Sequence, residues 1–473
     1  MQSSLIDRGS GSSMNGVTEG EAGSPARPTA LRALLSRYFA RRVVCPSELP
    51  RIMRKHIYTG AMGNIWASLI SGIIFVFYGT SIGITRFQWG VMTGLSSWLL
   101  ATQLVSAHLT ERTGRRKVIW FWFAITDRSL RLVGILIAYV LWHAGWPHPG
   151  VILITAICVA NFVGTMASPP WLSWLADIIP AEQHGTFLGR RSAWIAVSVI
   201  AVVSAAAWVV DWTPDGHKVY VAFAVLVFAT VVGILDLIIH GTIPEPEMAM
   251  PVRNHFWLQM LLPLRDQAFR PWLVFNVAWT FGMSLGGSLV TIYFLDDLGI
   301  RNNFLGGTLA FTCLSLVGSL LTGRWSGRMV DRVGIRPVLW VGHLFWASLP
   351  VFWLLATPGA ALIWIGVPSL IGGIASTAAL NAANKLITRV PPAESRATYI
   401  AVSTSLASIA AGLGALAAGC LLKGLGDWSI AFAGRSFGAF HLLFALSFAL
   451  RLASALFLTP RLAQPTSTAA ASI

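Results

Sequence analysis

The amino-acid sequence predicts an all-α membrane protein with twelve transmembrane helices in two pseudo-symmetric six-helix bundles. Only 11% of the 473 residues are charged and 55% are hydrophobic, whereas soluble domains carry about 25% charged residues. Apolar runs near the length of about 20 residues that spans a bilayer follow one another along the chain. Two short motifs occur once in each half, which indicates an internal repeat.

The N-terminal 57 residues are expected to form a cytoplasmic tail. They contain no apolar core of a signal peptide, and apolar residues recur with helical spacing from Leu31 to Phe39 beside several arginines. This pattern predicts an amphipathic helix on the membrane surface. A transit peptide is the alternative, but acidic residues interrupt the tail, and transit peptides are poor in acids.

The first six-helix bundle is expected at residues 58–242. Pro169 and Pro170 lie inside its fourth apolar run, and because proline interrupts helical hydrogen bonding, this span should be bent. The predicted spans are 58–80, 88–109, 117–142, 150–178, 191–211 and 219–241.

A central loop at residues 243–271 is expected to connect the bundles. Its apolar part, Phe256 to Leu264, is too short to cross a bilayer and should lie at the interface. The second bundle is expected at 272–460 and a cytoplasmic tail at 461–473. The predicted spans of this bundle are 272–295, 304–323, 337–356, 361–388, 396–421 and 437–458.

Basic residues set the orientation. With the N-terminus in the cytoplasm, the outside loops hold only Arg86, Lys218, Arg301, Lys423 and Arg435, and the other loop Lys and Arg lie inside. Cytoplasmic loops carry the excess of Lys and Arg in membrane proteins. Both termini are therefore predicted to be cytoplasmic, in the inner membrane, and the net charge of +15 does not indicate a nucleic-acid partner.

Two repeated motifs support the duplication. Residues 107–116 read AHLTERTGRR and residues 327–336 read GRMVDRVGIR, each after the second apolar run of its half. Residues 180–187, PAEQHGTF, return as residues 392–399, PAESRATY, where the fifth run of each half begins.

The first motif has the composition of a tight cytoplasmic turn. Gly114 and Gly334 can adopt positive φ between two helices, and the basic residues beside them hold the loop at the membrane surface. Glu111 and Asp331 lie near the C-termini of their own helices, where a negative charge is unfavourable. The N-terminus of another helix would be a better partner for each acid.

On these motifs and the twelve spans, residues 56–460 resemble the major facilitator superfamily, whose signature is G-x-x-x-D-R-x-G-R-R after the second helix. Here Ala107 replaces the glycine, Glu111 replaces the aspartate, and Ile335 stands at a basic position of the second copy. The sequence around the fourth and fifth spans is similar to that of a bacterial-type subgroup without an assigned substrate. The resemblance implies the superfamily fold and alternating access between its two bundles.

The resemblance also implies a conformational gate on the cytoplasmic side. Glu111 would meet the start of the eleventh span, Asp331 would meet the start of the fifth, and Asp177 would join Arg112 in a charge network. Such contacts would hold the halves together in an outward-open state; the alternative is that these charges only set the topology. The gate residues are Glu111, Arg112, Gly114, Arg116, Asp177, Asp331, Arg332, Gly334 and Arg336.

In this superfamily the first, fourth, seventh and tenth spans line the central cavity, so their amide and indole side chains are substrate candidates. An amide inside the membrane needs a polar partner, which either a substrate or another helix can supply. The candidates are Asn64, Trp66, Asn161, Asn276, Trp279, Asn381 and Asn384.

Asp127, Arg128 and Arg131 form a charge cluster inside the third predicted span. At 1.5 Å per residue they lie about 15 Å deep, near the bilayer midplane. Asp127 and Arg131 can pair across one helical turn, which leaves Arg128 without a local partner. Proton coupling or anion attraction is one interpretation, and a structural ion pair is the other. Asp236 and His240 of the sixth span are expected at the membrane interface.

The sequence favours a secondary transporter that moves a small organic solute by alternating access. It contains neither a G-x-x-x-x-G-K-[ST] loop for ATP nor an H-E-x-x-H motif, so an enzyme is not expected. The fifth span lacks the Gly-Pro-rich pattern of drug antiporters, which favours uptake or uniport. Drug/proton efflux and a transporter-like sensor without turnover are the alternatives.

The expected partners are a small-molecule substrate, the lipid bilayer and, as a candidate coupling ion, protons. The four cysteines are far apart and lack metal-site spacing, so no metal is expected. No cofactor and no nucleic acid are expected, and we expect a monomer.

The predicted orientation places Arg265 inside the cell and Arg435 outside. In a variant without native cysteines, an impermeant thiol reagent should label Arg435→Cys in intact cells and should label Arg265→Cys only after permeabilisation. Labelling of Arg265→Cys in intact cells would overturn the topology.

Overall fold

The computed structural model describes residues 38–42, 44–247, 260–391, 396–432 and 435–462. Contacts divide the chain into Met1–Ala40 and Arg41–Ile473, and all helices named below belong to the second unit. Most of the amphipathic helix predicted from Leu31, and residues 256–259 of the apolar part of the central loop, lie outside the described residues.

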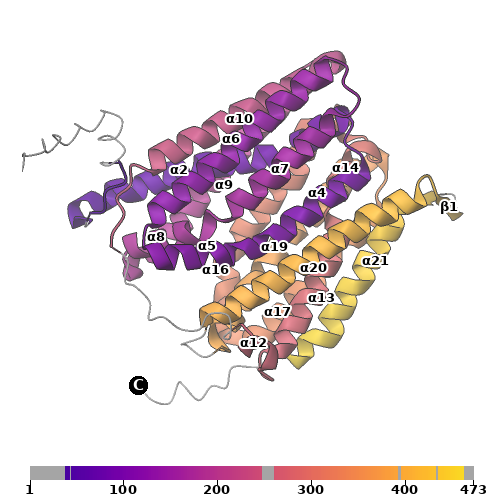
Figure 1. Ribbon diagram of the computed structural model, residues 1–473. Coiled ribbons are helices and arrows are strands. Elements are labelled where there is room, and N and C mark those ends of the chain that lie inside the picture. Colours follow the sequence, from indigo (N-terminus) through magenta and orange to yellow (C-terminus); the bar gives the residue numbers. More distant parts are fainter. Residues whose placement is uncertain (1–37, 43, 248–259, 392–395, 433–434, 463–473) are drawn as a thin grey trace, which may run out of the picture. The chain divides into compact units, whose positions relative to one another are not determined.

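Six helical segments form the first half (Figure 1). The first breaks at Gly72, whose backbone is extended between α2 and α3. The fourth is bent as predicted, because Pro169 and Pro170 occupy the first turn of α8, where a missing N–H costs no helical hydrogen bond. The segments are α2 Leu49–Ser71 with α3 Ile73–Ser81, α4 Arg86–Trp98 with α5 Gln103–Thr113, α6 Arg116–His143, α7 Pro149–Thr165 with α8 Ser168–Ile178, α9 Ala181–Asp211, and α10 Lys218–His240.

The second half repeats this order after the short helix α12, Leu262–Arg265. A hairpin of β1 Ser429–Phe432 and β2 Arg435–Gly438, which the apolar pattern did not predict, precedes the last segment. The segments are α13 Arg270–Gly287 with α14 Val290–Asp296, α15 Phe304–Thr308 continued by a π-helical turn, Leu309–Cys313, into α16 Leu314–Val333, α17 Ile335–Ala347 with α18 Leu349–Leu355, α19 Ala361–Arg389, α20 Arg396–Leu425, and α21 Ala439–Ala453 continued by a π-helical turn, Ser454–Leu458.

Ten of the helical segments in the described part of the chain are long and apolar enough to cross a membrane. The other two are the segment of α4 and α5, which a 3-10 turn at Leu99–Thr102 interrupts, and α6, which carries the charge cluster. Charged residues lower the hydropathy of α6 without shortening it. The protein is therefore the predicted all-α membrane protein with two six-helix halves.

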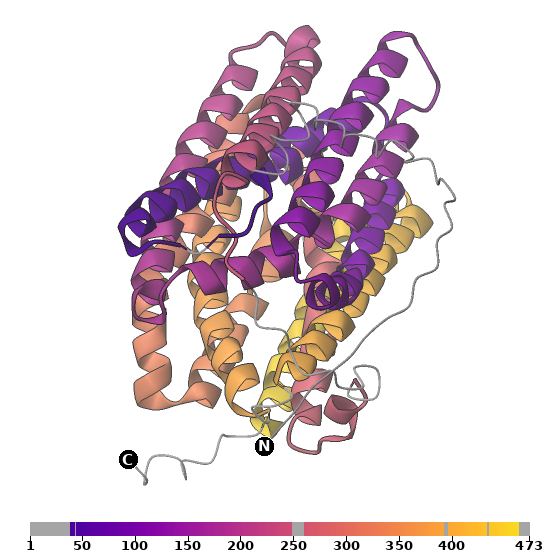
Figure 2. The ribbon, with the colours of Figure 1, turned by 60° about the vertical axis from the view of Figure 1, so that its left-hand side comes forward.

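The two halves pack along α4 and α20, which lie side by side (Figures 1 and 2). A Cβ placed on Gly90 would lie only 2.8 Å from the Cα of Gly419, and one on Gly94 would lie 2.9 Å from the carbonyl oxygen of Gly412. Small residues of this kind let two membrane helices approach at backbone distance. We call this contact the α4–α20 seam.

The halves are also joined at the end of the bundle that carries the turns at Gly83 and Gly299, here called the closed end. The Asp211 carboxylate, at the end of α9, accepts hydrogen bonds of 2.7 Å from both Phe304 N and Leu305 N, the first residues of α15. An acid at a helix N-terminus satisfies free N–H groups and favours the helix dipole. The first half thus caps a helix of the second.

The other end carries the turns at Gly114 and Gly334 and is here called the basic end. Gly114 has φ of 62° and Gly334 has φ of 100°, which confirms the predicted left-handed turns. Asp331 does not contact the described start of α9, residues 187–189; its carboxylate lies 2.6 Å from Lys385 of its own half. The side chain of Glu111 lies outside the described part.

The predicted Asp177–Arg112 network is wrong in one partner. Asp177 pairs with Arg116 at the start of α6, whereas Arg112 is exposed. Arg116 is fully buried, and it also donates to the carbonyl of Pro246 at 2.9 Å and lies 3.8 Å from Glu245. Arg116 therefore ties α8 and the start of the central loop to the turn at Gly114.

Removing the Asp211 cap should weaken the closed end. An N-cap acid contributes about 1–2 kcal/mol, so Asp211→Ala should shift the ratio of open to closed conformers about tenfold. Spin labels at Thr213→Cys and Asn302→Cys would report the distance across this end.

Asp215→Ala is the matched control, because Asp215 pairs with Lys218 of its own half and is exposed. Equal distance distributions for Asp211→Ala and the control would contradict a gating role for the cap.

Candidate functional site

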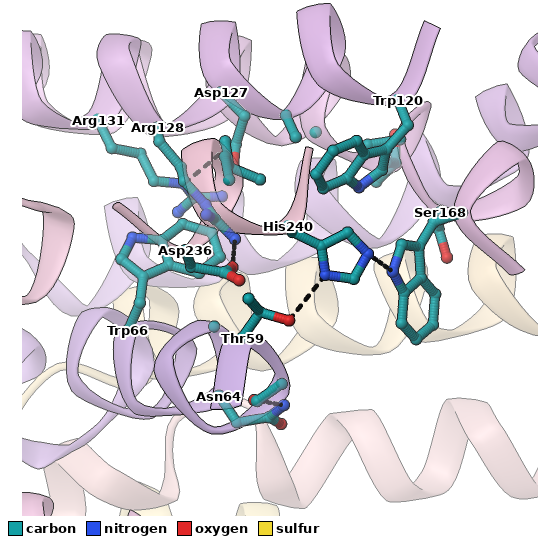
Figure 3. Close-up of a pocket in the computed structure, with 18 of the residues that line it drawn as sticks. Thr59, Asn64, Trp66, Trp120, Asp127, Arg128, Arg131, Ser168, Asp236 and His240 are labelled. Carbon is teal, nitrogen blue, oxygen red and sulfur yellow. Dashed lines mark hydrogen bonds and ion pairs between the residues drawn. The ribbon is translucent and has the colours of Figure 1, made fainter. Parts of the chain in front are cut away.

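A cavity of about 460 Å³ lies inside the first half, and all of its lining residues come from that half (Figure 3). Charged, amide, indole and imidazole groups surround it, which is unusual for a site between membrane helices. The polar lining includes Thr59, Asn64, Trp66, Asp127, Arg128, Arg131, Asn161, Trp171, Arg191, Asp236 and His240.

Arg128 is buried and binds groups from two other helices. Its Nη2 lies 2.9 Å from Asp236 Oδ2 on α10, and its Nη1 donates to the carbonyl of Gly233 on the same helix. The Trp66 ring of α2 covers the guanidinium, with its centroid 4.5 Å from Cζ. The arginine that lacked a local partner in the sequence thus pairs with an acid of the sixth segment.

Arg131 connects α6 to α7 and α4. Its Nε donates to Asp127 Oδ1 at 2.8 Å, as the i, i+4 spacing predicted, and its Nη2 donates to Asn161 Oδ1. The amide nitrogen of Asn161 donates to Ser96 Oγ at 2.5 Å. This chain of contacts fixes the orientation of the Asn161 amide at the cavity wall.

The cluster is electrically balanced, because two arginines meet two aspartates, all four of them buried. A buried ion pair is tolerated only when both charges and their hydrogen-bonding groups are satisfied. Asp236 and His240, which the sequence predicted at the membrane interface, are 6% and 3% exposed and line the cavity, and their depth in the membrane stays a prediction.

His240 is held as a neutral imidazole by its partners. Trp171 Nε1 donates to Nε2 at 3.1 Å, so Nε2 carries no proton. Thr59 donates its hydroxyl proton to the carbonyl of Lys55 and therefore accepts from Nδ1, 2.8 Å away. The tautomer with its proton on Nδ1 satisfies all these bonds.

Glycines make room for the charged side chains. A Cβ on Gly63 would lie 2.8 Å from Asp236 Oδ2, one on Gly164 would lie 2.7 Å from Asp127 Cγ, and one on Gly233 would lie 2.7 Å from the Trp66 ring. These contacts were not predicted. The sequence did contain one indication of them, because Asp236 and His240 are four residues apart in the sixth apolar run and therefore lie on one polar face of that helix.

The substrate candidates of the first half come together. Asn64, Trp66 and Asn161 all line the cavity, and Trp66, Arg131 and Asn161 also line a second cavity of about 560 Å³. Residues 287, 288 and 291 of the second half complete that cavity. The charge cluster therefore lies beside a space shared by both halves.

The candidates of the second half lie elsewhere. Asn276 donates to Ser403 Oγ at 3.1 Å and Asn381 donates to Ser326 Oγ at 2.8 Å, so both amides bind neighbouring helices. Asn384 is exposed and Trp279 is buried. None of these four lines the first-half cavity, and their role in binding a substrate stays a prediction.

Comparison with known proteins identifies a related family. The model of the Major Facilitator Superfamily matches residues 57–415. No curated protein matches the chain.

Solved transporter structures share the fold at low identity. A mutant of the nucleoside transporter NupG has 11% identity and a TM-score of 0.65, over 86% of this chain and 99% of that one. A D-xylose-proton symporter has 14% identity and a TM-score of 0.62, over 88% of this chain and 98% of that one. A bacterial homolog of the human lysosomal transporter Spinster, in an inward-facing and occupied conformation, has 15% identity and a TM-score of 0.61, over 89% of this chain and 98% of that one.

Breaking the buried Arg128–Asp236 pair should destabilise the protein strongly. Arg128→Gln leaves the Asp236 charge uncompensated, which costs about 3–5 kcal/mol, and it should lower the thermal unfolding temperature in detergent. Arg128→Gln with Asp236→Asn removes both charges and should restore most of the loss.

The exposed pair of Arg42 and Glu48 provides the control, since Arg42→Gln should change stability by at most about 1 kcal/mol. If the double variant is no more stable than Arg128→Gln alone, the two charges are not coupled.

Proposed function

Because the chain belongs to the major facilitator superfamily and is a secondary transporter rather than an enzyme, we propose that it carries a small organic solute by alternating access, with uptake or uniport as its mode. The observation that carries this proposal is the balanced charge cluster of α6 and α10 beside a cavity that both halves line. Charged side chains inside the membrane are energetically costly, and their presence there marks a candidate functional site.

The basic end is proposed to face the cytoplasm, because the loops at that end hold most of the Lys and Arg. The closed end then faces outward, and we take the structure as a state closed to the outside by the Asp211 cap and by the ion pair of Arg86 in the first half with Asp296 in the second. In the outward-open state the halves would separate at that end, and Asp331 would leave Lys385 for the start of α9.

Proton coupling is proposed to act on the Arg128–Asp236 pair. A proton that binds Asp236 removes its charge, so the ion pair is lost and the guanidinium is free to take another partner at the cavity wall. The neutral His240 lies on the same helix face, one turn away, and Thr59 links it to α2. These side chains couple three helices of the first half to one protonation event.

Solute flux into proteoliposomes tests the proposal. The purified protein should accumulate at least one member of a panel of radiolabelled sugars, nucleosides and organic acids, and an inward proton gradient should raise the plateau if protons are coupled. A uniporter would equilibrate the solute without accumulation. Binding without flux would instead indicate a sensor.

The charge cluster should be needed for this flux. The variant with Arg128→Gln and Asp236→Asn removes one charge of each sign and should fold, and its flux or pH dependence should be lost, whereas Arg265→Gln on the surface of α12 should leave both unchanged. Normal, pH-insensitive transport by the double variant would show that the pair is only structural.

A further inference from the structure

Among the described residues of the second half, Arg451 on α21 is the buried arginine, with only 2% of its surface exposed. Its Nη2 donates to the carbonyl of Trp346 at 2.7 Å, and its Cζ lies 5.3 Å from the centroid of the Trp279 ring. Its Nε is buried without a hydrogen-bond partner. The guanidinium thus has contacts with neutral groups and donors to spare.

No acid in the described part of the second half neutralises Arg451. The acids of this half lie at helix ends or in loops, and the three best satisfied bind elsewhere: Asp266 accepts from Tyr399, Asp296 from Arg301 and Asp331 from Lys385. Asp297 lies 3.9 Å from Arg86 and Asp427 follows the end of α20, whereas Arg451 lies in the last turn of α21. An unpaired charge in a dry interior costs several kcal/mol.

Arg451 lines a cavity of about 420 Å³ that is separate from the first-half site. Thr312, Ser315, Ser369 and Ser376 contribute hydroxyl groups to the same wall. Gly287 lines both this cavity and the shared cavity between the halves. The two spaces therefore adjoin at Gly287.

Comparison with the first half shows that Arg451 lacks an acidic partner. There, a tryptophan of the first segment covers an arginine, and Asp236 of the sixth segment supplies the counter-charge. In the second half, Trp279 of the corresponding segment covers Arg451, and the facing side chain on α17 is His343, whose ring centroid lies 4.4 Å from that of Trp279. The aromatic cover is repeated, but the acid is not.

We propose that the cavity at Arg451 binds the carboxylate or phosphate group of a small organic anion, which supplies the absent counter-charge. A guanidinium with free N–H donors is suited to both groups. The hydroxyl groups of Thr312 and Ser315 can donate further hydrogen bonds, whereas those of Ser369 and Ser376 already donate to the carbonyls of Ile365 and Gly373. This inference rests on the proposed transport function and gives its substrate class: an organic acid or a phosphate ester.

Binding to the purified full-length protein tests the site. Calorimetric titration with benzoate, phenyl phosphate and chloride, and with neutral benzamide, separates a carboxylate, a phosphate and an inorganic anion from an uncharged ring of the same size. Benzoate or phenyl phosphate should bind more tightly than benzamide. Arg451→Met should weaken that binding about tenfold or more, while Arg451→Lys should retain part of it.

Arg435 is half-buried and donates to the carbonyls of Leu355 and Ala356. It gives the matched control, and Arg435→Met should bind as the wild type does. Because methionine replaces a buried cation with an apolar chain of similar length, Arg451→Met should fold, and its elution profile and unfolding temperature verify this. Equal binding by Arg451→Met and wild type, or no binding of any of the three anions, overturns the proposal.

Flux separates this inference from the proposed function. Arg451-dependent binding without flux in proteoliposomes supports the anion site and contradicts transport. Flux of a neutral solute that Arg451→Met leaves unchanged supports transport and contradicts the anionic substrate.

Discussion

A guanidinium buried among membrane helices must meet an opposite charge, and the pair of Arg128 and Asp236 satisfies this requirement by joining α6 to α10. The position of Trp66 over the guanidinium adds α2 to the same contact. Because a shift of any of these helices by one turn would separate the charges, the pair sets their register. Glycine is needed at positions 63 and 233, because a Cβ there would collide with Asp236 and with the Trp66 ring.

The two halves share a plan but differ in how their interiors are charged. The first half pairs Arg128 and Arg131 with its own aspartates, whereas the second holds Arg451 against a carbonyl and an indole ring. A repeated fold therefore carries paired charges in the interior of one half and, within the described residues, an arginine without an acidic partner in the interior of the other.

Much of the fold could be predicted from the sequence, because apolar length, proline positions and the repeated glycine turns are local properties. The i, i+4 pairing of Asp127 with Arg131 is local as well. The partner of Arg128 could not be predicted, since Asp236 lies on a helix that is distant in the chain and only packing brings them together. For the same reason Arg116, not Arg112, receives Asp177. The gate contacts also depend on which end of the bundle is closed, and a sequence encodes both states.

The α4–α20 seam limits how one half can move against the other. A Cβ on Gly412 would lie 2.2 Å from the Trp98 ring, and Trp98 Nε1 donates to the carbonyl of Ile409, so the contact is tight below the glycine pairs as well. Side chains that interdigitate hold a contact in discrete steps, whereas Gly90 and Gly94 bring the backbone of α4 against the backbone of α20. The seam is therefore suited to serve as an axis of rotation, about which the two bundles turn while distances along it stay nearly constant.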